Sequence, residues 1–153
     1  MKNFLPLMFS LTLSWADAQS FHLPTPEGWH EEFIAFPLEF APSISYQGEE
    51  HLRFPPGWGE IKSEEFWSYC YLWWIEEKAA ISKESLERDL KQYYDGLVGR
   101  NIISRKIDST LVVPTVVEFQ PIEKGKKTAF KGTVKMLDYM GLRPIVLKLD
   151  VRV

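Results

Sequence analysis

Hydrophobic residues recur with a helical period in the middle of the chain. Leucine and tyrosine follow one another every three or four residues, at Leu86, Leu90, Tyr93, Tyr94 and Leu97. This spacing places them on one stripe of an α-helix, with charged residues on the opposite face. Ser82 is a suitable N-cap, and Gly99 is a residue that ends a helix in the left-handed conformation. The pattern predicts one helix of about four turns between them.

After this helix the period changes to two, which indicates β-strands. The alternation is clearest in 145–153, where Ile145, Leu147 and Leu149 alternate with Lys148 and Asp150. Two further strands are predicted over 109–119 and 128–138. The glycine in 123–126 favours a tight hairpin turn before the second of these.

The part of the chain over 19–62 is rich in proline, with Pro24, Pro26, Pro37, Pro42, Pro55 and Pro56. Proline at this density excludes long helices and favours short edge strands, here 30–36 and 50–54. Together with the later elements, this predicts an α+β domain. We expect a mostly antiparallel sheet of about five to six strands, with one long helix packed on one face.

An unusually aromatic segment over 65–77 is predicted to be a further strand. Strand alternation divides it into two faces. One face carries Phe66, Ser68, Cys70, Leu72 and Trp74, and the other carries Trp67, Tyr69, Tyr71, Trp73 and Ile75. Because Ser68 and Cys70 are small, we expect their face to contact the helix and Cys70 to be a buried apolar side chain.

The row of large rings on the other face must then be covered by something else. Three candidates remain: the proline-rich segment with its own aromatic residues, another protein chain, or a ligand that stacks on the rings. The predicted contact surface joins this row to a tryptophan in the loop before it. Its residues are Trp58, Trp67, Tyr69, Tyr71 and Trp73.

The first residues have the layout of a secretory signal peptide. Lys2 precedes an apolar run from Phe4 to Trp15, and Ala16-Asp17-Ala18 provides small residues at a cleavage site. The sequence therefore predicts a signal peptide over 1–18 and a single domain over 19–153. We expect a periplasmic or secreted protein that is not stably inserted in a membrane after cleavage.

Charge and cysteine content narrow the range of partners. The net charge is −3, whereas nucleic acids and anionic membranes attract clustered lysine and arginine. The chain has one cysteine, so it forms no internal disulfide. The hydrophobic fraction of 45% is sufficient for a packed core without such a cross-link.

No residue pattern in the chain specifies a reaction. His30 and His51 each adjoin glutamates, and they could meet if their strands pair, with Glu32 and Glu49 nearby. A zinc site needs three or four converging ligands, however, and adjacent strand residues point to opposite faces. The nucleophile, phosphate-binding and dinucleotide motifs do not occur. We therefore predict no catalytic residues, no metal site and no cofactor.

Two parts of the chain resemble a group of small, uncharacterised bacterial proteins. The first is FPLEFAP over 36–42, followed by YQG over 46–48 and EEHLRFPPG over 49–57. The second is LERDLKQYYDGL over 86–97. The resemblance covers less than half of the chain and implies no activity.

The resulting hypothesis is an exported α+β domain that binds rather than catalyses. Its partner would be another protein or a component of the cell envelope. Two alternatives stay open: a small periplasmic hydrolase or isomerase, and a carrier of an apolar or sugar-like ligand.

Overall fold

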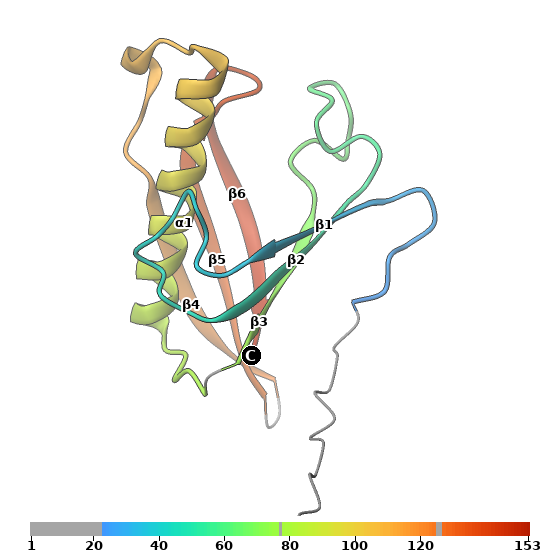
Figure 1. Ribbon diagram of the computed structural model, residues 1–153, viewed down its shortest axis with the longest axis vertical. Helices are drawn as coiled ribbons and strands as arrows, with labels where there is room; N and C mark the ends of the chain where they lie inside the picture. Colours follow the sequence, from blue (N-terminus) through green and yellow to red (C-terminus); the bar gives the residue numbers. More distant parts are fainter. Residues whose placement is uncertain (1–22, 77, 125–126) are drawn as a thin grey trace, which may run out of the picture.

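A computed structural model describes residues 23–76, 78–124 and 127–153. The signal peptide predicted over 1–18 lies outside them. In chain order the elements are β1 (His30–Ala35), β2 (Gly48–Phe54), β3 (Cys70–Ile75), α1 (Lys83–Arg105), a 3-10 turn (Ser109–Leu111), β4 (Val116–Lys124), β5 (Lys127–Asp138) and β6 (Arg143–Arg152) (Figure 1). The predicted α+β class is confirmed.

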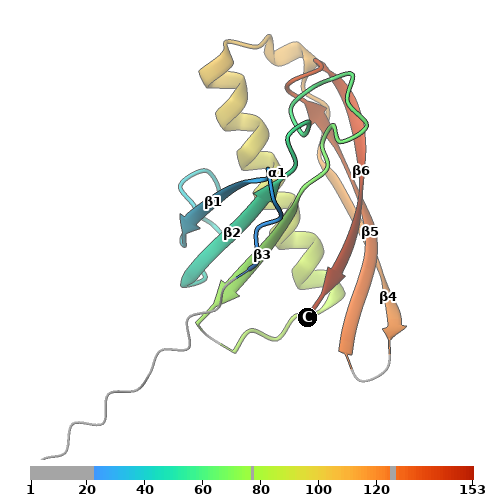
Figure 2. The same ribbon diagram turned by 90° about the vertical axis from the view of Figure 1, so that its right-hand side faces the viewer.

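The strands form two sheets, so the expected single sheet of five to six strands is wrong. One sheet has the order β1-β2-β3 and the other β4-β5-β6, and all pairs are antiparallel. Figure 2 shows the two sheets on opposite sides of the view, with α1 passing between them. Each strand pairs only with its neighbours in the chain, and no strand of the first sheet pairs with a strand of the second in the described ranges.

Helix α1 begins where the sequence predicts but ends later. Ser82 is the N-cap: its hydroxyl accepts a hydrogen bond from the Ser85 N–H, and Ser85 Oγ accepts one from the Ser82 N–H at 2.9 Å. The predicted end at Gly99 is wrong. The helix continues to Arg105 and closes at Lys106 in the left-handed conformation. The residues after Gly99 are compatible with a helix, and Ile102 packs against the core.

The core lies between α1 and the β4-β5-β6 sheet. The predicted helix stripe is buried, with Leu90 and Tyr94 each 1% exposed. From β5, Val134 and Met136 meet it and are fully buried. The predicted alternation is thus confirmed for β5 and β6, whereas the strand predicted over 109–119 is wrong in its first part, because 109–111 form the 3-10 turn and β4 begins at Val116.

The proline-rich part also contributes to the core. Leu38 and Ile44 are almost completely buried, although neither lies in a helix or strand. A Cβ on Gly96 of α1 would stand 1.9 Å from the Phe40 carbonyl oxygen. The absence of a side chain at Gly96 is therefore what lets this loop lie directly on the helix.

The aromatic strand is shorter than predicted. Strand β3 starts at Cys70, and the residues before it form turns, with Ser68 N–H donating to the Glu65 carbonyl at 2.8 Å. Trp67 has φ of 57°, so it does not continue the row of Tyr69, Tyr71 and Trp73 as a strand residue. The high aromatic content of this segment concealed the turn, because propensity alone favours a strand there.

The two faces of β3 are reversed relative to the prediction. The helix meets the row of large rings: Tyr71 stacks on Tyr93 of α1 with centroids 5.8 Å apart and an interplanar angle of 9°. Cys70, expected to be buried against the helix, is exposed on the other face together with Trp74. Stacked aromatic rings fill this interface better than the small side chains of Ser68 and Cys70 would.

Candidate binding groove

A groove of about 620 Å³ separates the two sheets. Its walls are β3 on one side and the end of β6 on the other, and Leu86 and Leu90 of α1 lie at its base. Figure 2 shows these two strands with the helix behind them. The segment leading into α1 completes the lining with Lys78, Ala79 and Ile81.

Both walls are the free edges of their sheets. Glu76 N–H donates to the Gln47 carbonyl at 3.0 Å, which identifies a hydrogen-bonded pair in the β2–β3 ladder. Pairs of this kind alternate along antiparallel strands. The backbone groups of Cys70, Leu72 and Trp74 therefore point to β2. Those of Tyr71, Trp73 and Ile75 point into the groove.

The same reasoning applies to β6. Val153 N–H donates to the Thr128 carbonyl at 3.0 Å, so the odd-numbered residues of β6 bond to β5. The backbone N–H and C=O groups of Lys148, Asp150 and Arg152 then point away from β5, into the groove. No hydrogen bond joins these groups, or their counterparts on β3, to another residue in the described ranges.

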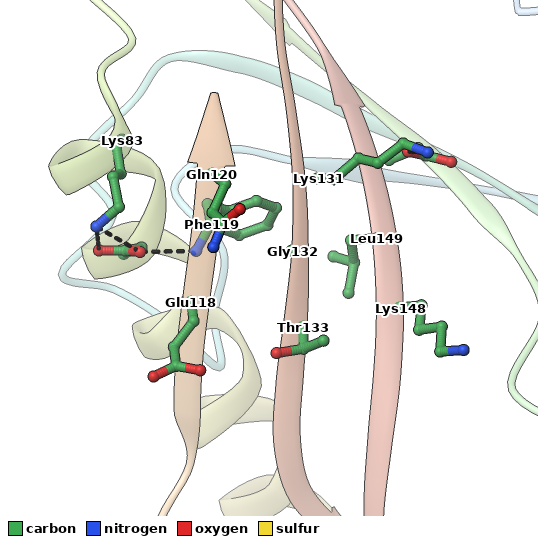
Figure 3. Close-up of a pocket in the computed structure, with 11 residues that line it drawn as sticks. Lys83, Glu118, Phe119, Gln120, Lys131, Gly132, Thr133, Lys148 and Leu149 are labelled. Atoms are coloured by element: carbon green, nitrogen blue, oxygen red, sulfur yellow. Dashed lines mark hydrogen bonds and ion pairs between the residues drawn. The ribbon is translucent and has the colours of Figure 1, made fainter. Parts of the chain in front are cut away.

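The edge of β4, in contrast, is protected at two positions. Phe119 N–H points away from β5 and donates to Glu87 Oε1 of α1 at 2.7 Å (Figure 3). Pro121, the next outward residue, has no N–H to offer. Proteins commonly protect sheet edges in these ways. The edges of β3 and β6 differ from that of β4 in this respect, and β3 combines its open edge with an apolar, uncharged sequence.

The predicted contact residues divide between the groove and the interior. Tyr69, Tyr71 and Trp73 line the groove, although their rings pack toward α1. Tyr69 and Tyr94 share a hydrogen bond between their hydroxyls at 3.0 Å. Burial raises the pKa of Tyr69 and Tyr71 well above the ordinary value. These three partly buried rings therefore support the wall from the helix side, while the backbone groups of Tyr71 and Trp73 point into the groove.

Trp67 and Trp58 lie outside the groove. Trp67 is 7% exposed, and its indole N–H donates to Asp138 Oδ1 at 2.9 Å. Trp58 packs on Phe54 with ring centroids 4.6 Å apart. Part of the aromatic row is thus covered by the chain itself, from Phe36 and Phe54 as well as from the helix.

A buried carboxyl lies behind the wall formed by β3. Glu50 of β2 has no exposed surface and accepts a hydrogen bond from Trp73 Nε1 at 3.0 Å. Burial raises its pKa to about 7, and the hydrogen bond from Trp73 opposes only part of that increase. Glu50 is not among the residues that line the groove, so its role in this arrangement is to hold Trp73 in place.

A second depression, of about 680 Å³, lies over β4, β5 and β6 (Figure 3). It opens above Gly132, which has no side chain. Four of its charged groups form two pairs: Lys83 with Glu87 at 3.0 Å, and Lys131 with Asp150 at 3.7 Å. This polar surface presents no enclosed set of reacting groups.

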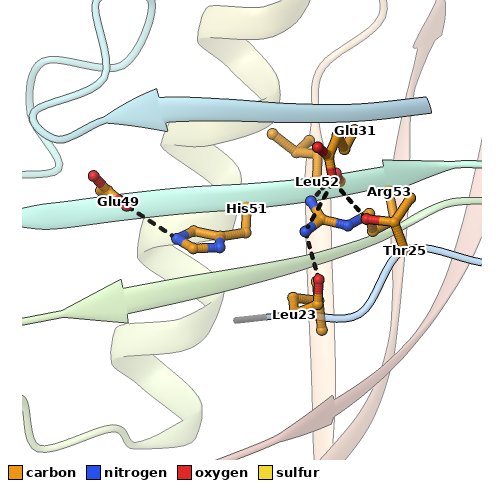
Figure 4. A network of polar contacts seen from close by, with 7 residues as sticks. All are labelled: Leu23, Thr25, Glu31, Glu49, His51, Leu52 and Arg53. Carbon is orange, nitrogen blue, oxygen red and sulfur yellow. Dashed lines mark hydrogen bonds and ion pairs between the residues drawn. The ribbon is translucent and has the colours of Figure 1, made fainter. Parts of the chain in front are cut away.

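The histidines do not converge as the sequence allowed. Strands β1 and β2 do pair, but the register places His30 opposite Phe54 and His51 opposite Phe33. His30 and His51 therefore lie on opposite faces, and His51 Nε2 instead contacts Glu49 Oε2 at 3.1 Å (Figure 4). Within residues 23–76, 78–124 and 127–153, no group of three or more His, Cys, Asp or Glu side chains could hold a metal ion.

Arg53 occupies the same face as His51 and is completely buried. Its guanidinium donates to the carbonyls of Leu52 at 2.7 Å and Leu23 at 2.5 Å, and lies 3.5 Å from Glu31 (Figure 4). It also stands over the Phe33 ring, 5.1 Å from its centroid. Arg53 thus joins the chain at Leu23 to the sheet.

Sequence reasoning missed the part of the groove contributed by β6 and α1. The alternation over 145–153 assigned Lys148, Asp150 and Arg152 to the polar face, but not to an open edge. Edge position depends on strand order, which local patterns do not encode.

None of the helices among the described residues has the length and hydropathy needed to cross a membrane.

Comparison of the chain with protein-family models, with curated proteins and with solved structures finds no significant match.

Proposed function

We propose that this chain is a binding domain that recognises another protein or a component of the cell envelope, and that it is not an enzyme. The observation that carries the proposal is the groove between β3 and β6, whose base is apolar and whose walls offer unpaired backbone groups. Such a surface supplies burial and hydrogen bonds to a partner. The tyrosines with raised pKa values at its wall are partly buried and pack against the helix, where they stabilise packing.

Export to the periplasm or the medium belongs to the same proposal. It is supported by Lys2, the apolar run from Phe4 to Trp15 and the small residues at 16–18. The test is N-terminal sequencing of the protein recovered from a bacterial host that expresses the full chain. We expect a mature protein that starts at Gln19, whereas an intact Met1 would contradict export.

The test of binding uses cross-linking and affinity capture from envelope extracts. The bait is the purified protein, and the control is the double variant Lys148→Glu with Arg152→Glu, in which two exposed groove residues change sign. We expect one protein to be enriched by the wild type, displaced by free wild-type protein and lost with the control. Equal capture by both baits would contradict recognition through the groove.

A carrier of a small apolar ligand is the second candidate, because a volume of about 620 Å³ falls within the range of ligand pockets. A thermal-shift screen with fatty acids, sterols and oligosaccharides separates the two. A carrier would be stabilised by one ligand class at micromolar concentration. A binding domain for proteins would respond to none of them.

A further inference from the structure

We propose that the groove receives an extended peptide segment of a partner protein, which is inserted as a strand between β3 and β6. The segment would carry apolar side chains at alternate positions and acidic side chains at the others. This inference rests on the proposed binding function and specifies the chemistry of the partner.

The first argument is the backbone itself. The groups of Tyr71, Trp73 and Ile75 face the groove from one side, and those of Lys148, Asp150 and Arg152 face it from the other. A strand placed between them has its own backbone groups directed alternately left and right. It would therefore bond to both edges and join the sheets in the order β1-β2-β3-peptide-β6-β5-β4. Strand addition to an open edge is a common mode of peptide recognition.

The directions of β3 and β6 favour one orientation of the inserted peptide. Strands β3 and β6 both run toward the end of the molecule where the C-terminus lies, as the two views agree (Figures 1 and 2). One inserted strand can then be antiparallel to both neighbours at once. Antiparallel pairing is the more stable arrangement per residue. If β3 and β6 ran in opposite directions, one side would have to pair in parallel.

The lining determines which side chains fit. Leu86 and Leu90 at the base favour apolar side chains at alternate positions of the peptide. The charged residues of the lining are Lys78, Lys148 and Arg152, against the single acid Asp150, which already pairs with Lys131. The groove is therefore basic in a chain whose net charge is −3. This complementarity favours acidic residues at the outward positions of the peptide.

The length of the walls gives the length of the segment. Strand β3 spans six residues, and β6 lines the groove with Lys148 to Val153. At about 3.3 Å per residue, a peptide of about six residues fills the groove. The matched probe is a capped peptide of alternating glutamate and valine, about eight residues long to allow for frayed ends.

The decisive experiment is N-methylation of the probe. One version is methylated on the backbone nitrogens of the glutamates, and the other on the backbone nitrogens of the valines. Because the backbone N–H groups of alternate residues point to opposite sides, each version lacks the donors that face one of the two edges, β3 or β6. Binding to the full protein is measured by calorimetry. A strand that bridges both edges predicts that each version binds at least tenfold more weakly than the unmodified peptide. Unchanged binding of both versions would show contact through charge or side chains alone and would overturn the proposal.

A matched pair of protein variants tests the same bonds from the other side. Asp150→Pro removes one N–H that faces the groove and leaves the ladder with β5 intact, because proline is tolerated at such edge positions. Asp150→Ala removes the same carboxylate and keeps the N–H. We expect at least tenfold weaker peptide binding for Asp150→Pro and less than threefold change for Asp150→Ala. Equal affinities of the two folded variants would contradict strand insertion.

Two further controls test whether the groove takes an acidic peptide, a basic peptide or a second copy of this chain. A peptide of alternating lysine and valine should bind at least tenfold more weakly than the acidic peptide, and stronger binding of the lysine peptide would overturn the acidic assignment. Sedimentation of the free protein tests a second copy as occupant. A dimer that the acidic peptide cannot dissociate would replace the proposed partner by another copy of this chain.

These outcomes separate this inference from the proposed function. If an envelope protein is captured by wild type and equally by Asp150→Pro, the binding function stands and strand insertion fails. If the wild type captures no partner, the binding function fails, whether or not the acidic peptide binds.

Discussion

The indole N–H of Trp67 donates to Asp138 Oδ1 at 2.9 Å and so connects the turn before β3 to the turn after β5. The same oxygen accepts the backbone N–H groups of Met140 and Gly141, each at 2.9 Å. Both side chains are buried. One carboxylate thus organises the β5–β6 turn and holds the two sheets together at one end of the groove.

This bond should be measurable in a double-mutant cycle. Trp67→Phe keeps an aromatic ring and loses the donor, and Asp138→Ala removes the acceptor. We expect Trp67→Phe to lower the free energy of unfolding by about 1–3 kcal/mol and Asp138→Ala to lower it more, because two backbone donors also lose their partner. The coupling energy from urea denaturation should exceed about 0.5 kcal/mol. Additive effects would mean that the bond contributes nothing to stability.

The base of the groove is also part of the core. Leu90 is 1% exposed, so Leu90→Ala should lower the free energy of unfolding by about 2–5 kcal/mol through lost burial and the cavity that remains. Ile103, on the same helix, is 81% exposed. Ile103→Ala should change stability by less than about 0.5 kcal/mol. Similar losses for the two variants, measured by denaturant titration, would contradict the position of the helix.

Two glycines of α1 should respond in opposite ways to alanine. Gly96→Ala places a methyl group against the Phe40 carbonyl and should destabilise the protein by at least about 1 kcal/mol despite the better helix propensity of alanine. A Cβ on Gly99 would meet no neighbouring atom within 4 Å, so Gly99→Ala should stabilise by up to about 1 kcal/mol. Thermal unfolding of both variants checks this. Stabilisation by both would show that the loop does not lie on the helix.

Glu50 should make stability depend on pH. Its pKa is about 7 in the folded protein and near the ordinary 4.5 in the unfolded chain. Between these values the folded protein keeps a proton that the unfolded chain has released, so the free energy of unfolding falls as pH rises through this window. Above about pH 7 Glu50 causes no further change in the free energy of unfolding. The total decrease in the free energy of unfolding from low to high pH is about 3 kcal/mol.

The neutral variant Glu50→Gln supplies the comparison. Denaturation at about pH 5 and about pH 8 should show a smaller decrease for this variant than for the wild type, because glutamine does not titrate. The variant should therefore gain stability relative to the wild type as pH rises. Parallel pH profiles of the two proteins would show that Glu50 ionises as readily in the folded state as in the unfolded chain.

Local patterns predicted the elements of this fold better than their assembly. Helix α1 was found from its leucine and tyrosine stripe, and β6 from the alternation beginning at Ile145, since these periods reflect burial on one face. The division into two sheets was not predicted. It depends on β3 and β6 remaining unpaired, and that is a relationship between residues about 75 positions apart.

The candidate site shows the same limit. The sequence points to Tyr71 and Trp73 for their rings, yet it is their backbone groups that face the groove edge-on, while the rings pack toward the helix. Trp67 was assigned to the wrong environment because a left-handed residue inside an aromatic run has no signature in composition. The alternation divides β3 into a face with small side chains and a face with large rings, but it does not say which face contacts the helix. The prediction placed the small side chains there, and the structure places the rings there.

The contact between Glu87 and the Phe119 N–H has a consequence for self-association. A sheet with two unpaired edge strands can pair with other molecules on both sides, but here a side chain of α1 hydrogen-bonds to one edge strand of the C-terminal sheet. Edge-to-edge association of this sheet is therefore directed to β6. Two copies that pair through β6 use the open edge of both sheets, which favours a closed pair over a fibre.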